Sequence, residues 1–312
     1  MNILIYGGSG YLGGLIANSL CYKYNITVCT RRLDKTNNYK KNITFKKINY
    51  NSLKHFNNNE KKKIDLIIHL VGMNKSESIN NPKKSLELKK KVTLNIVKLA
   101  NKKNCRIFYF SSIQVYKNFD KEKIINEKSN LSNSNSYIKG HLLAEKILLS
   151  KSNNLKKVTI LRLSSVFGTN IINSSKELIF TLANNFCYQA IRKKYITVEN
   201  PSLVRNFLPS QILIKYLNLL INKNFKSNKI FNLGYRSLTL EMLSNIIKER
   251  SEKILKTKCI LNLKNKPNKN KNLLIYKSNF LNLKYNKSIF NKEIDNLLKL
   301  FKKNIYEKKK YY

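Results

Sequence analysis

The sequence has little of several residue types, and each scarcity excludes a class of protein. Four Pro and nine Gly in 312 residues, with 42% hydrophobic residues, are typical of a packed globular protein and not of a disordered one. No apolar run approaches the roughly 18 residues of a membrane-spanning helix, and the apolar segment directly after Met1 predicts no signal peptide. The five cysteines lack metal-ligand spacing, which predicts reduced thiols in a cytoplasmic protein without a metal site.

Acidic residues are also scarce: the chain has 17 of them against 61 basic residues, for a formal charge of +44. Eight of the basic residues are Arg and the other 53 are Lys, spread along the whole chain. Direct base recognition favours Arg, and single-strand binding uses aromatic residues interleaved with the charge. Neither pattern is visible, so we predict no specific nucleic-acid partner. The charge alone keeps a nucleic-acid-associated function open as an alternative and predicts salt-sensitive association with polyanions.

What the sequence does have is a glycine-rich segment near its start. The apolar run Ile3–Tyr6 leads into Gly7-Gly8-Ser9-Gly10-Tyr11-Leu12-Gly13-Gly14, and an amphipathic stretch follows. A strand, a glycine turn and a helix in this order bind the pyrophosphate of a dinucleotide, because the helix start presents N–H groups and a positive dipole end. Gly7 can take the positive φ of the turn, Gly10 leaves room for the phosphates, and Gly13 lets helix and strand pack closely. The predicted dinucleotide contacts are Gly7, Gly10, Tyr11, Leu12 and Gly13.

Short apolar runs alternate with helix-period segments through the first half of the chain. The predicted strands are Asn2–Tyr6, Ile26–Thr30, Thr44–Asn49, Asp65–Leu70, Arg106–Ser111 and Val158–Ser164. This alternation predicts an α/β fold, a Rossmann-type doubly wound parallel sheet, and its loosening after Gly168 predicts a smaller C-terminal substrate lobe. We expect a dinucleotide-binding domain over residues 1–168, with a segment near 205–235 returning to it, and a mainly substrate-binding lobe over 169–312.

Six further motifs follow the glycine segment in order. They are Ile68–Gly72, Phe108–Tyr116, Tyr137–Glu145, Leu161–Gly168, Val204–Leu208 and Phe231–Gly234. With the glycine segment, this ordered set resembles the extended short-chain dehydrogenase/reductases, the NAD-dependent epimerase/dehydratase family that includes nucleotide-sugar epimerases. The resemblance covers essentially the whole chain. It implies an enzyme that uses NAD or NADP on a nucleotide-sugar substrate, with a homodimer as a possible assembly.

The resemblance also implies three catalytic positions. In this family a Tyr is the general acid/base on a sugar hydroxyl, and a Ser or Thr at a strand end hydrogen-bonds the same oxygen; Tyr137 and Ser112 match these positions. A Lys four residues after the Tyr, on the same helix face, acidifies the phenol and binds the nicotinamide ribose. This chain has His141 there, and by the resemblance both Tyr137 and His141 are also predicted cofactor contacts. Three interpretations stay open: His141 substitutes for Lys, activity is slow and shifted to higher pH, or the protein binds nucleotide without efficient turnover.

Two neighbouring departures from the family narrow the reaction. Dehydratases of the family carry an Asp-Glu pair directly after the Ser, and its decarboxylases keep the Glu. This chain has Ile113-Gln114, and neither side chain exchanges protons. Dehydration and decarboxylation are therefore disfavoured. We predict an NAD(P)-dependent nucleotide-sugar epimerase, with an NADPH-dependent keto-sugar reductase or a nucleotide-sensing binding protein of the same fold as alternatives.

Further cofactor contacts are predicted at three strand ends. Arg31 and Arg32 follow the second strand, where Arg suits the 2′-phosphate of NADP and a carboxylate would suit NAD. We therefore expect NADP more than NAD, the alternative being that both are solvated cations. Asn49 stands where many relatives have an Asp that accepts from adenine, and its amide oxygen can still accept. His69 is expected to be a packed, hydrogen-bonded residue. The strand end that lines the cofactor by resemblance is Leu70, Val71 and Gly72.

Two residues are predicted to bind substrate in addition to Ser112. Arg205 matches an Arg that contacts the nucleotide diphosphate in sugar-nucleotide enzymes, and a guanidinium can hold a phosphate pair bidentately. The alternative for Arg205 is a structural ion pair between the lobes. Ser165 replaces an Asn that often touches the substrate phosphate.

Overall fold

The computed structural model describes the chain over residues 1–31, 33, 42–50, 63–117, 123–151, 158–169, 181–223, 225, 227–266, 273–278 and 283–309. The chain forms two compact units. The first unit contains Met1–Lys117, Ser129–Leu163 and Leu219–Phe231, and the second contains Asn118–Lys128, Ser164–Asn218 and Asn232–Tyr312. Each unit is therefore built from segments that are distant in the sequence.

A seven-stranded sheet is the framework of the first unit. Its strands are β1 (Asn2–Tyr6), β2 (Asn25–Thr30), β3 (Ile43–Lys47), β4 (Leu66–His69), β5 (Arg106–Ser112), β7 (Val158–Leu163) and β11 (Lys229–Leu233). They lie in the order β11-β7-β5-β4-β1-β2-β3, and the pairings from β7 to β3 are parallel. The order reverses between β1 and β4, which is where open α/β sheets bind ligands. The predicted Rossmann-type doubly wound fold is confirmed.

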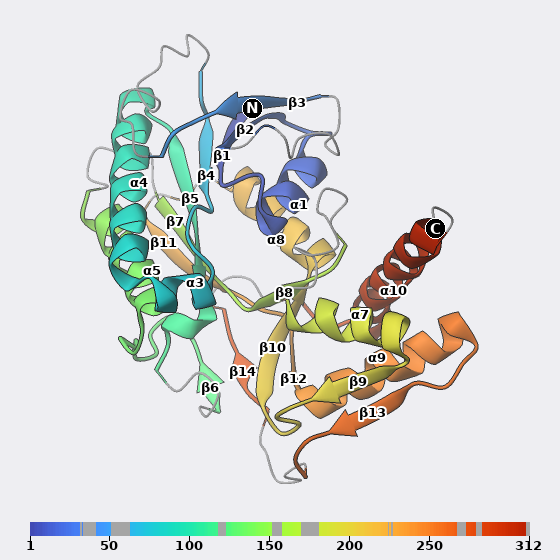
Figure 1. The fold of residues 1–312 in the computed structure, drawn as a ribbon. Coiled ribbons are helices and arrows are strands. Elements are labelled where there is room, and N and C mark those ends of the chain that lie inside the picture. The colour runs from blue at the N-terminus through green and yellow to red at the C-terminus, as the bar shows by residue number, and fades with distance from the viewer. Residues whose placement is uncertain are drawn as a thin grey trace. The chain divides into compact units, whose positions relative to one another are not determined.

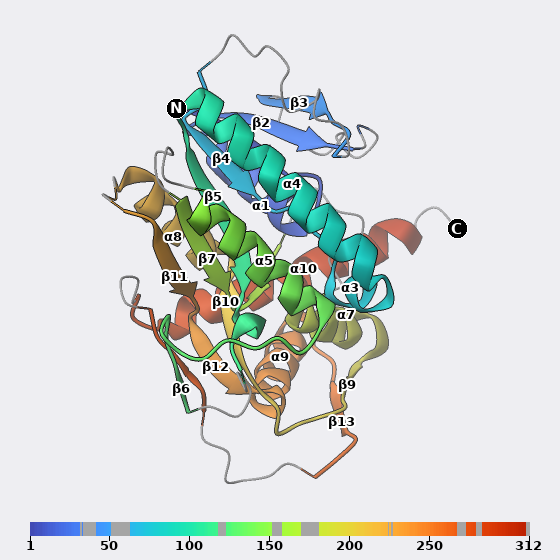
Figure 2. The same cartoon turned by 90° about the vertical axis from the view of Figure 1, so that its left-hand side faces the viewer.

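Helices cover both faces of this sheet. They are α1 (Tyr11–Leu20), α3 (Lys75–Asn80), α4 (Pro82–Lys103) and α5 (Ser136–Ser150), with a 3-10 turn η1 (Ile113–Val115) after β5. α4 and α5 lie together on one face, and α1 lies on the other (Figure 1 and Figure 2). Gly140 of α5 lies at the contact between α4 and α5, where a Cβ would be 3.8 Å from Leu86 and 3.9 Å from the Lys89 side chain.

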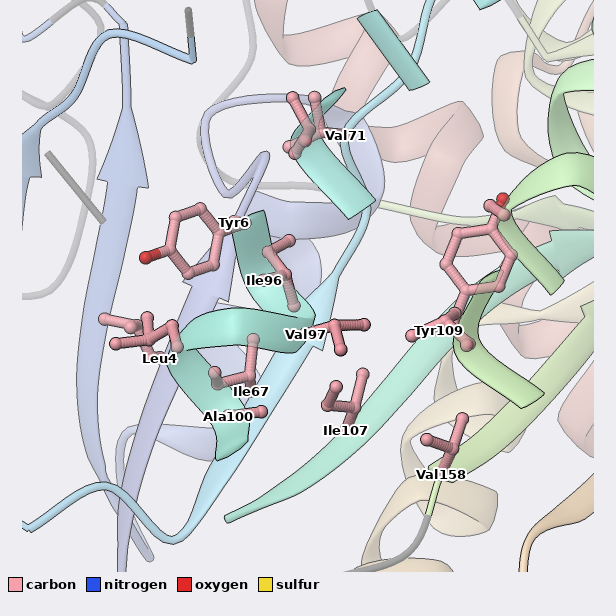
Figure 3. Close-up of a cluster of buried hydrophobic side chains, with 14 of the residues drawn as sticks. Leu4, Tyr6, Ile67, Val71, Ile96, Val97, Ala100, Ile107, Tyr109 and Val158 are labelled. Atoms are coloured by element: carbon pink, nitrogen blue, oxygen red, sulfur yellow. The ribbon is translucent and has the colours of Figure 1, made fainter. Parts of the chain in front are cut away.

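The main apolar core of the first unit fills the space between the sheet and the helices α4 and α5. Strand side chains alternate between faces, so Ile67 of β4 and Ile107 of β5 meet Ile96 of α4 in this core (Figure 3). The same alternation places His69, two residues after Ile67, and Tyr109, two residues after Ile107, on this face. One edge of the core therefore ends in polar side chains at the carboxyl ends of β4 and β5.

The second unit contains smaller sheets and its own helices. Its strands are β6 (Ile124–Ile125), β8 (Ser165–Phe167), β9 (Tyr195–Val198), β10 (Val204–Pro209), β12 (Arg236–Thr239), β13 (Ile260–Leu263) and β14 (Ile275–Tyr276). β12, β10 and β8 form one sheet, while β13 pairs with β9 and β14 with β6. The helices are α7 (Leu182–Lys193), α9 (Leu240–Leu255) and α10 (Lys287–Lys309), which pack against one another, and α8 (Ser210–Asn222), which contributes residues to both units.

Within the described ranges, no helix combines the length and apolar character needed to cross a membrane. The same ranges contain no group of three or more His, Cys, Asp or Glu side chains that could hold a metal ion. All five cysteines are buried, and none forms a disulfide.

Candidate active site

The glycine turn joins β1 to α1 at the point where the strand order reverses. Gly7 has a φ of +84°, a left-handed conformation that favours glycine, and a Cβ there would lie 3.1 Å from backbone atoms of Leu70 and Val71. Gly13 lies in the first turn of α1, where a Cβ would come within 2.4 Å of the Gly7 carbonyl oxygen and of Gly8 Cα. The turn therefore packs closely against both its own helix and the segment after β4.

Gly10 differs from these glycines because it faces open space. It is exposed, and the nearest atom to a Cβ built there is the Gly7 carbonyl oxygen at 3.6 Å. Gly10 is also the N-cap of α1 and provides no side-chain cap, so the helix presents its first N–H groups without a covering side chain. Tyr11 and Leu12 follow as half-buried residues. A cradle of this kind fits the pyrophosphate of a dinucleotide, because backbone and anion can approach directly.

The end of β2 and the segment after β3 fix the turn. Thr30, the last residue of β2, is buried, and its hydroxyl donates to Ser9 Oγ at 2.9 Å. The Tyr50 hydroxyl accepts a hydrogen bond from the Gly7 N–H at 3.2 Å. Two segments distant from the turn in the sequence thus hold its backbone in place.

Two of the residues predicted to bind the adenosine half, Arg31 and Asn49, follow the strands β2 and β3. Arg31 follows β2, is exposed, and has its guanidinium carbon 5.8 Å from the centre of the Tyr50 ring. Asn49 is exposed and lies two residues after the end of β3. Arg32 lies outside the described residues. Tyr50 therefore links Arg31 to the turn, since its ring contacts one and its hydroxyl the other.

Tyr137 and Ser112 come together at the carboxyl end of β5. Ser112 ends β5, Tyr137 is the second residue of α5, and their side chains are hydrogen-bonded. Burial raises the pKa of the Tyr137 phenol, and the hydrogen bond with Ser112 offsets part of that rise. The Ser112 hydroxyl also accepts from the Gln114 N–H at 3.2 Å, which orients it. The pair has the geometry for proton transfer, but a phenol with a raised pKa needs another group to acidify it.

His141 lies one helical turn after Tyr137 and is neutral. Its ring meets the Tyr137 ring edge-on with centres 4.7 Å apart, and its Nδ1 lies 2.8 Å from Tyr109 Oη. Burial lowers the pKa of His141 well below its usual range, and the charge of Lys89 lowers it further, while burial raises the pKa of Tyr109. The direction of this hydrogen bond depends on the tautomer of the ring: where Tyr109 donates to Nδ1, the ring proton lies on Nε2. His141 therefore offers a hydrogen-bond donor without a positive charge.

The structure adds a residue that sequence analysis missed, Lys89 of α4. Its side chain is only 7% exposed, and its Nζ donates to the Val71 carbonyl at 2.7 Å. The Nζ also lies 5.6 Å from the centre of the Tyr109 ring. A Cβ on Gly72 would lie 2.3 Å from Nζ, so the amino group rests directly against that residue. Burial lowers the pKa of Lys89 to about 8, which leaves it mostly charged at pH 7.

A closed set of hydrogen bonds holds Lys89 against β4. The Val71 N–H donates to His69 Nδ1 at 3.3 Å, and His69 Nε2 lies 3.1 Å from Thr93 Oγ1. Thr93 in turn donates to the Lys89 carbonyl at 2.7 Å, and the Lys89 side chain returns to the Val71 carbonyl. Since the Val71 N–H can only donate, the proton of His69 lies on Nε2. Burial lowers the pKa of His69, so His69 is a neutral, packed residue, as expected.

A buried ion pair ties α5 to the sheet next to these residues. Arg162 Nη2 of β7 lies 2.7 Å from Glu145 Oε2 of α5, and both side chains are almost fully buried. Ser111 donates to Glu145 Oε1 at 2.5 Å, and Arg162 Nη1 donates to Tyr116 Oη at 2.9 Å. The ion pair therefore anchors α5, which carries Tyr137, to β7, and the Ser111 hydrogen bond anchors it to β5, which ends in Ser112.

The two residues predicted to bind substrate phosphates belong to the second unit. Ser165 begins β8, Arg205 is the second residue of β10, and Phe207 of β10 is the register partner of Ser165. Arg205 and Phe207 are two residues apart and share a face, so Arg205 and Ser165 are diagonal neighbours on one face of this sheet. Both are half-buried, and Arg205 Nη1 donates to the Val204 carbonyl at 3.0 Å.

The fold is shared with several solved structures. One is UDP-glucose 4-epimerase from Thermotoga maritima, with 16% sequence identity and a TM-score of 0.77 over 98% of this chain and 100% of that chain. A second is UDP-N-acetylglucosamine 4-epimerase from Bacillus cereus, with 21% identity and a TM-score of 0.75 over 96% and 99%. A third is UDP-glucose 4-epimerase from Bifidobacterium longum in complex with NAD+ and UDP, with 18% identity and a TM-score of 0.76 over 97% and 99%.

A sequence model of one family also matches most of the chain. The model is that of the NAD dependent epimerase/dehydratase family, and the match extends over residues 3–234. This range includes the glycine turn, the Tyr137–Ser112 pair, His141 and Arg205. The chain therefore belongs to the NAD-dependent epimerase/dehydratase family.

Proposed function

We propose that this protein is an NAD(P)-dependent epimerase that inverts one carbon of a nucleotide sugar through a transient keto sugar. The observation that carries the proposal is the hydrogen-bonded Tyr137–Ser112 pair, in the same unit as the open glycine turn. Membership of the family supports an enzyme of this class. The likeness in fold to proteins named as UDP-sugar 4-epimerases supports a nucleotide sugar as substrate.

In this proposal the chain's own residues handle the proton of a sugar hydroxyl. The bound dinucleotide would accept a hydride from the sugar and return it. Tyr137 takes the hydroxyl proton as the carbon is oxidised and returns it when the carbon is reduced, and Ser112 hydrogen-bonds the oxygen in both states. Between the two steps the keto sugar presents its other face. Substrate and product have the same oxidation state, so no reductant is consumed.

The proposed dinucleotide contacts begin at the glycine turn. Gly7, Gly10 and Gly13 shape the cradle, and the first N–H groups of α1 would bind the pyrophosphate. Asn49 would accept from adenine. At the nicotinamide side, His141 would donate its Nε2–H to the ribose. The strand end Leu70, Val71 and Gly72 would line the same half of the cofactor.

The choice between NADP and NAD depends on the segment after β2. Arg31 is an exposed guanidinium beside the turn, and with Arg32 it suits a 2′-phosphate. We therefore propose NADP ahead of NAD. The Bifidobacterium longum neighbour was solved with NAD+, so both forms belong in the test.

Arg205 and Ser165 are the proposed contacts for the substrate diphosphate. They lie on one face of one sheet as diagonal neighbours, a spacing at which a guanidinium and a hydroxyl can hold adjacent phosphates. The neighbours' names make UDP-hexoses the first substrates to try.

A second candidate function is an NADPH-dependent keto-sugar reductase. The observation that favours it is Arg31 beside the turn, because reductases of this kind use the 2′-phosphorylated cofactor and release it oxidised after each turnover. The two functions differ in whether the cofactor stays bound. An epimerase regenerates its cofactor in place, whereas a reductase exchanges it.

The experiment is mass spectrometry of the nucleotide released when the purified protein is denatured. Retained NAD or NADP supports the epimerase, and an empty protein that binds added NADPH supports the reductase. A protein that binds no dinucleotide contradicts both. Gly10→Val serves as the control, because a Cβ there would contact only the Gly7 carbonyl oxygen, at 3.6 Å, and the larger side chain would keep the phosphates away from the turn.

A further inference from the structure

The Tyr137–Ser112 pair has no positively charged side chain at position 141, where the family has a Lys. Burial raises the pKa of Tyr137, so the phenol needs a cation close by to ionise near neutral pH. The family's Lys combines two roles, a positive charge and a hydrogen-bond donor. His141 has kept only the donor, because its ring is neutral and its Nδ1 is engaged by Tyr109.

Lys89 brings an amino group to the same place from another helix. Its side chain crosses from α4 to α5 at Gly140, the residue directly before His141, where a Cβ would lie 3.9 Å from Lys89 Cγ. Its Nζ then ends between the Val71 carbonyl at 2.7 Å and the Tyr109 ring, 5.6 Å from the ring centre. Tyr109 is the hydrogen-bond partner of His141. A larger residue at position 72 or 140 would displace this side chain.

We infer that Lys89 is a positioning residue of the active site, whose ammonium supplies the positive charge next to Tyr109 and His141, and through them to Tyr137, while His141 supplies only the hydrogen-bond donor. The inference deepens the proposed function and rests on it. The two roles that relatives place on one Lys are thus divided between α4 and α5. Lys89 acts through electrostatics and not through contact with the reacting atoms.

The charge of Lys89 is not neutralised by its surroundings. The titratable groups around it are His69 of β4, Tyr109 of β5 and His141 of α5, and none is an acid of low pKa. Among the described residues, Lys89 is in no ion pair with a carboxylate. On α4 itself Glu87 is exposed, and on α5 Glu145 is paired with Arg162. On α3, Glu77 is exposed and caps its own helix.

A buried cation in this setting has a defined effect on its neighbours. The low dielectric of the interior strengthens its field, and a positive field favours the ionised form of a nearby phenol and disfavours a proton on either histidine. The lowered pKa values of His69 and His141 both include a contribution from Lys89, so its field reaches both rings. A buried lysine without a counter-ion destabilises the fold, and such groups cluster at functional sites.

The test is a charge relocation from α4 to α5. Lys89→Met removes the charge and keeps the apolar stem, while Lys90→Met removes an exposed charge from the same helix and is the matched control. We expect Lys89→Met to lower kcat roughly tenfold or more with little change in KM, and Lys90→Met to stay within about twofold of the wild type. The double variant Lys89→Met/His141→Lys should recover most of the loss, because an ammonium then lies one helical turn after Tyr137, on the same helix face.

Recovery in the double variant separates an electrostatic role from a structural one, since a lysine on α5 cannot repair packing lost on α4. His141→Lys alone should gain no more than a few fold, because the wild type already has its cation. The inference is overturned if Lys89→Met matches Lys90→Met, or if the folded double variant is no more active than Lys89→Met. If Lys89→Met does not fold, Lys89→Gln is the second neutral variant, with a donor for Val71.

A second readout does not depend on turnover. The chain has three histidines, so the ¹⁵N spectra of the imidazoles of His55, His69 and His141 can be assigned. We expect the rings of His69 and His141 to take up protons at higher pH in Lys89→Met than in the wild type, and to be unchanged in Lys90→Met. Equal titrations in all three proteins contradict the inference. A wild type that turns over no nucleotide sugar contradicts the proposed function, and the spectra still decide the role of Lys89.

Discussion

Two regions at the carboxyl ends of the strands in the first unit are built in opposite ways. The glycine turn is a run of consecutive residues in which backbone matters most: a positive φ at Gly7, open space at Gly10, and close packing at Gly13. The acid/base cluster, which we define as Ser112, Tyr137, His141, Tyr109 and Lys89, is made of side chains from β5, α4 and α5.

The difference shows which parts of a site can be rebuilt. A backbone cradle depends on the absence of side chains at fixed positions, so it tolerates few substitutions. A positive charge, in contrast, can come from any side chain that reaches the same point, because its effect depends on distance and dielectric. Position 141 can therefore lack a Lys if α4 provides one.

Removal of the acid/base hydroxyl is the change with the largest expected effect. Tyr137→Phe should lower kcat on the order of 1,000-fold, because it removes the proposed acid/base group and the Ser112 hydroxyl cannot take over the proton transfer. Retained dinucleotide should stay at the wild-type level, since the phenol is outside the glycine turn. Steady-state kinetics and mass spectrometry of the released nucleotide measure both. An activity within tenfold of the wild type would mean that the cluster is assigned to the wrong residue.

Lys89 should leave a signature in the pH dependence of stability. Its pKa in the folded protein is about 8, against 10.5 for an ordinary lysine. Between these values the unfolded chain binds more protons, so the wild type gains stability as pH rises, by about 3 kcal/mol in total. Lys89→Met lacks this gain. The free energy of unfolding of the variant minus that of the wild type should therefore be higher at pH 7 than near pH 10.

Urea unfolding of both proteins at pH 7 and near pH 10 measures this difference. Lys90→Met, which removes an exposed lysine of the same helix, should show no such trend. A free-energy difference between Lys89→Met and the wild type that does not change with pH would show that Lys89 keeps an ordinary pKa. The account of a buried charge would then be wrong.

Dinucleotide binding by the glycine turn is tested by adding a side chain at Gly10, a position where the fold has room for one. Gly10→Val should weaken dinucleotide binding on the order of 100-fold, through the loss of about two charge-assisted hydrogen bonds from the first N–H groups of α1. The free energy of unfolding should change little, since a Cβ at Gly10 meets only the Gly7 carbonyl oxygen at 3.6 Å. Gly13→Val is the contrasting variant and should destabilise the fold, because its Cβ would overlap Gly7 and Gly8. Equal dinucleotide affinity in Gly10→Val and the wild type would remove the turn from the site.

The smallest expected effect is on cofactor choice. Arg31→Ala should raise the Kd for NADP by roughly threefold to tenfold and leave the Kd for NAD unchanged, because an exposed guanidinium contributes about 1 kcal/mol to a phosphate contact. Fluorescence titration with both reduced dinucleotides measures the ratio. Equal losses for both would show that Arg31 binds a part that they share.

Most strands of the central sheet were predictable because they are short buried apolar runs, whereas in β3 only Ile43 is buried. The predicted strand Asn2–Tyr6 has the same bounds in the structure, and the predicted strand Thr44–Asn49 differs by two residues at its end. The short strands β6, β8 and β14 were not predicted. They have only two or three residues each, and their pairing depends on segments distant in the sequence.

The site was predictable where a motif defines it. Ser112 and Tyr137, predicted from their positions in motifs, lie together. Lys89 could not be found in this way, because in the sequence it is one lysine of the run Lys89-Lys90-Lys91 on a helix. Its amino group rests against Gly72 and its stem lies next to Gly140, which come from other segments, and only the fold brings them to it.

The most direct test of the central claim is an isotope experiment without added cofactor. UDP-glucose and UDP-N-acetylglucosamine carrying deuterium at C4 are incubated with the purified protein, and the products are followed by NMR. The account predicts the C4 epimer with deuterium still at C4, because the hydride that leaves the sugar returns to the same carbon. A protein that carries its dinucleotide and forms no epimer, or that turns over only keto sugars with consumption of NADPH, would contradict it.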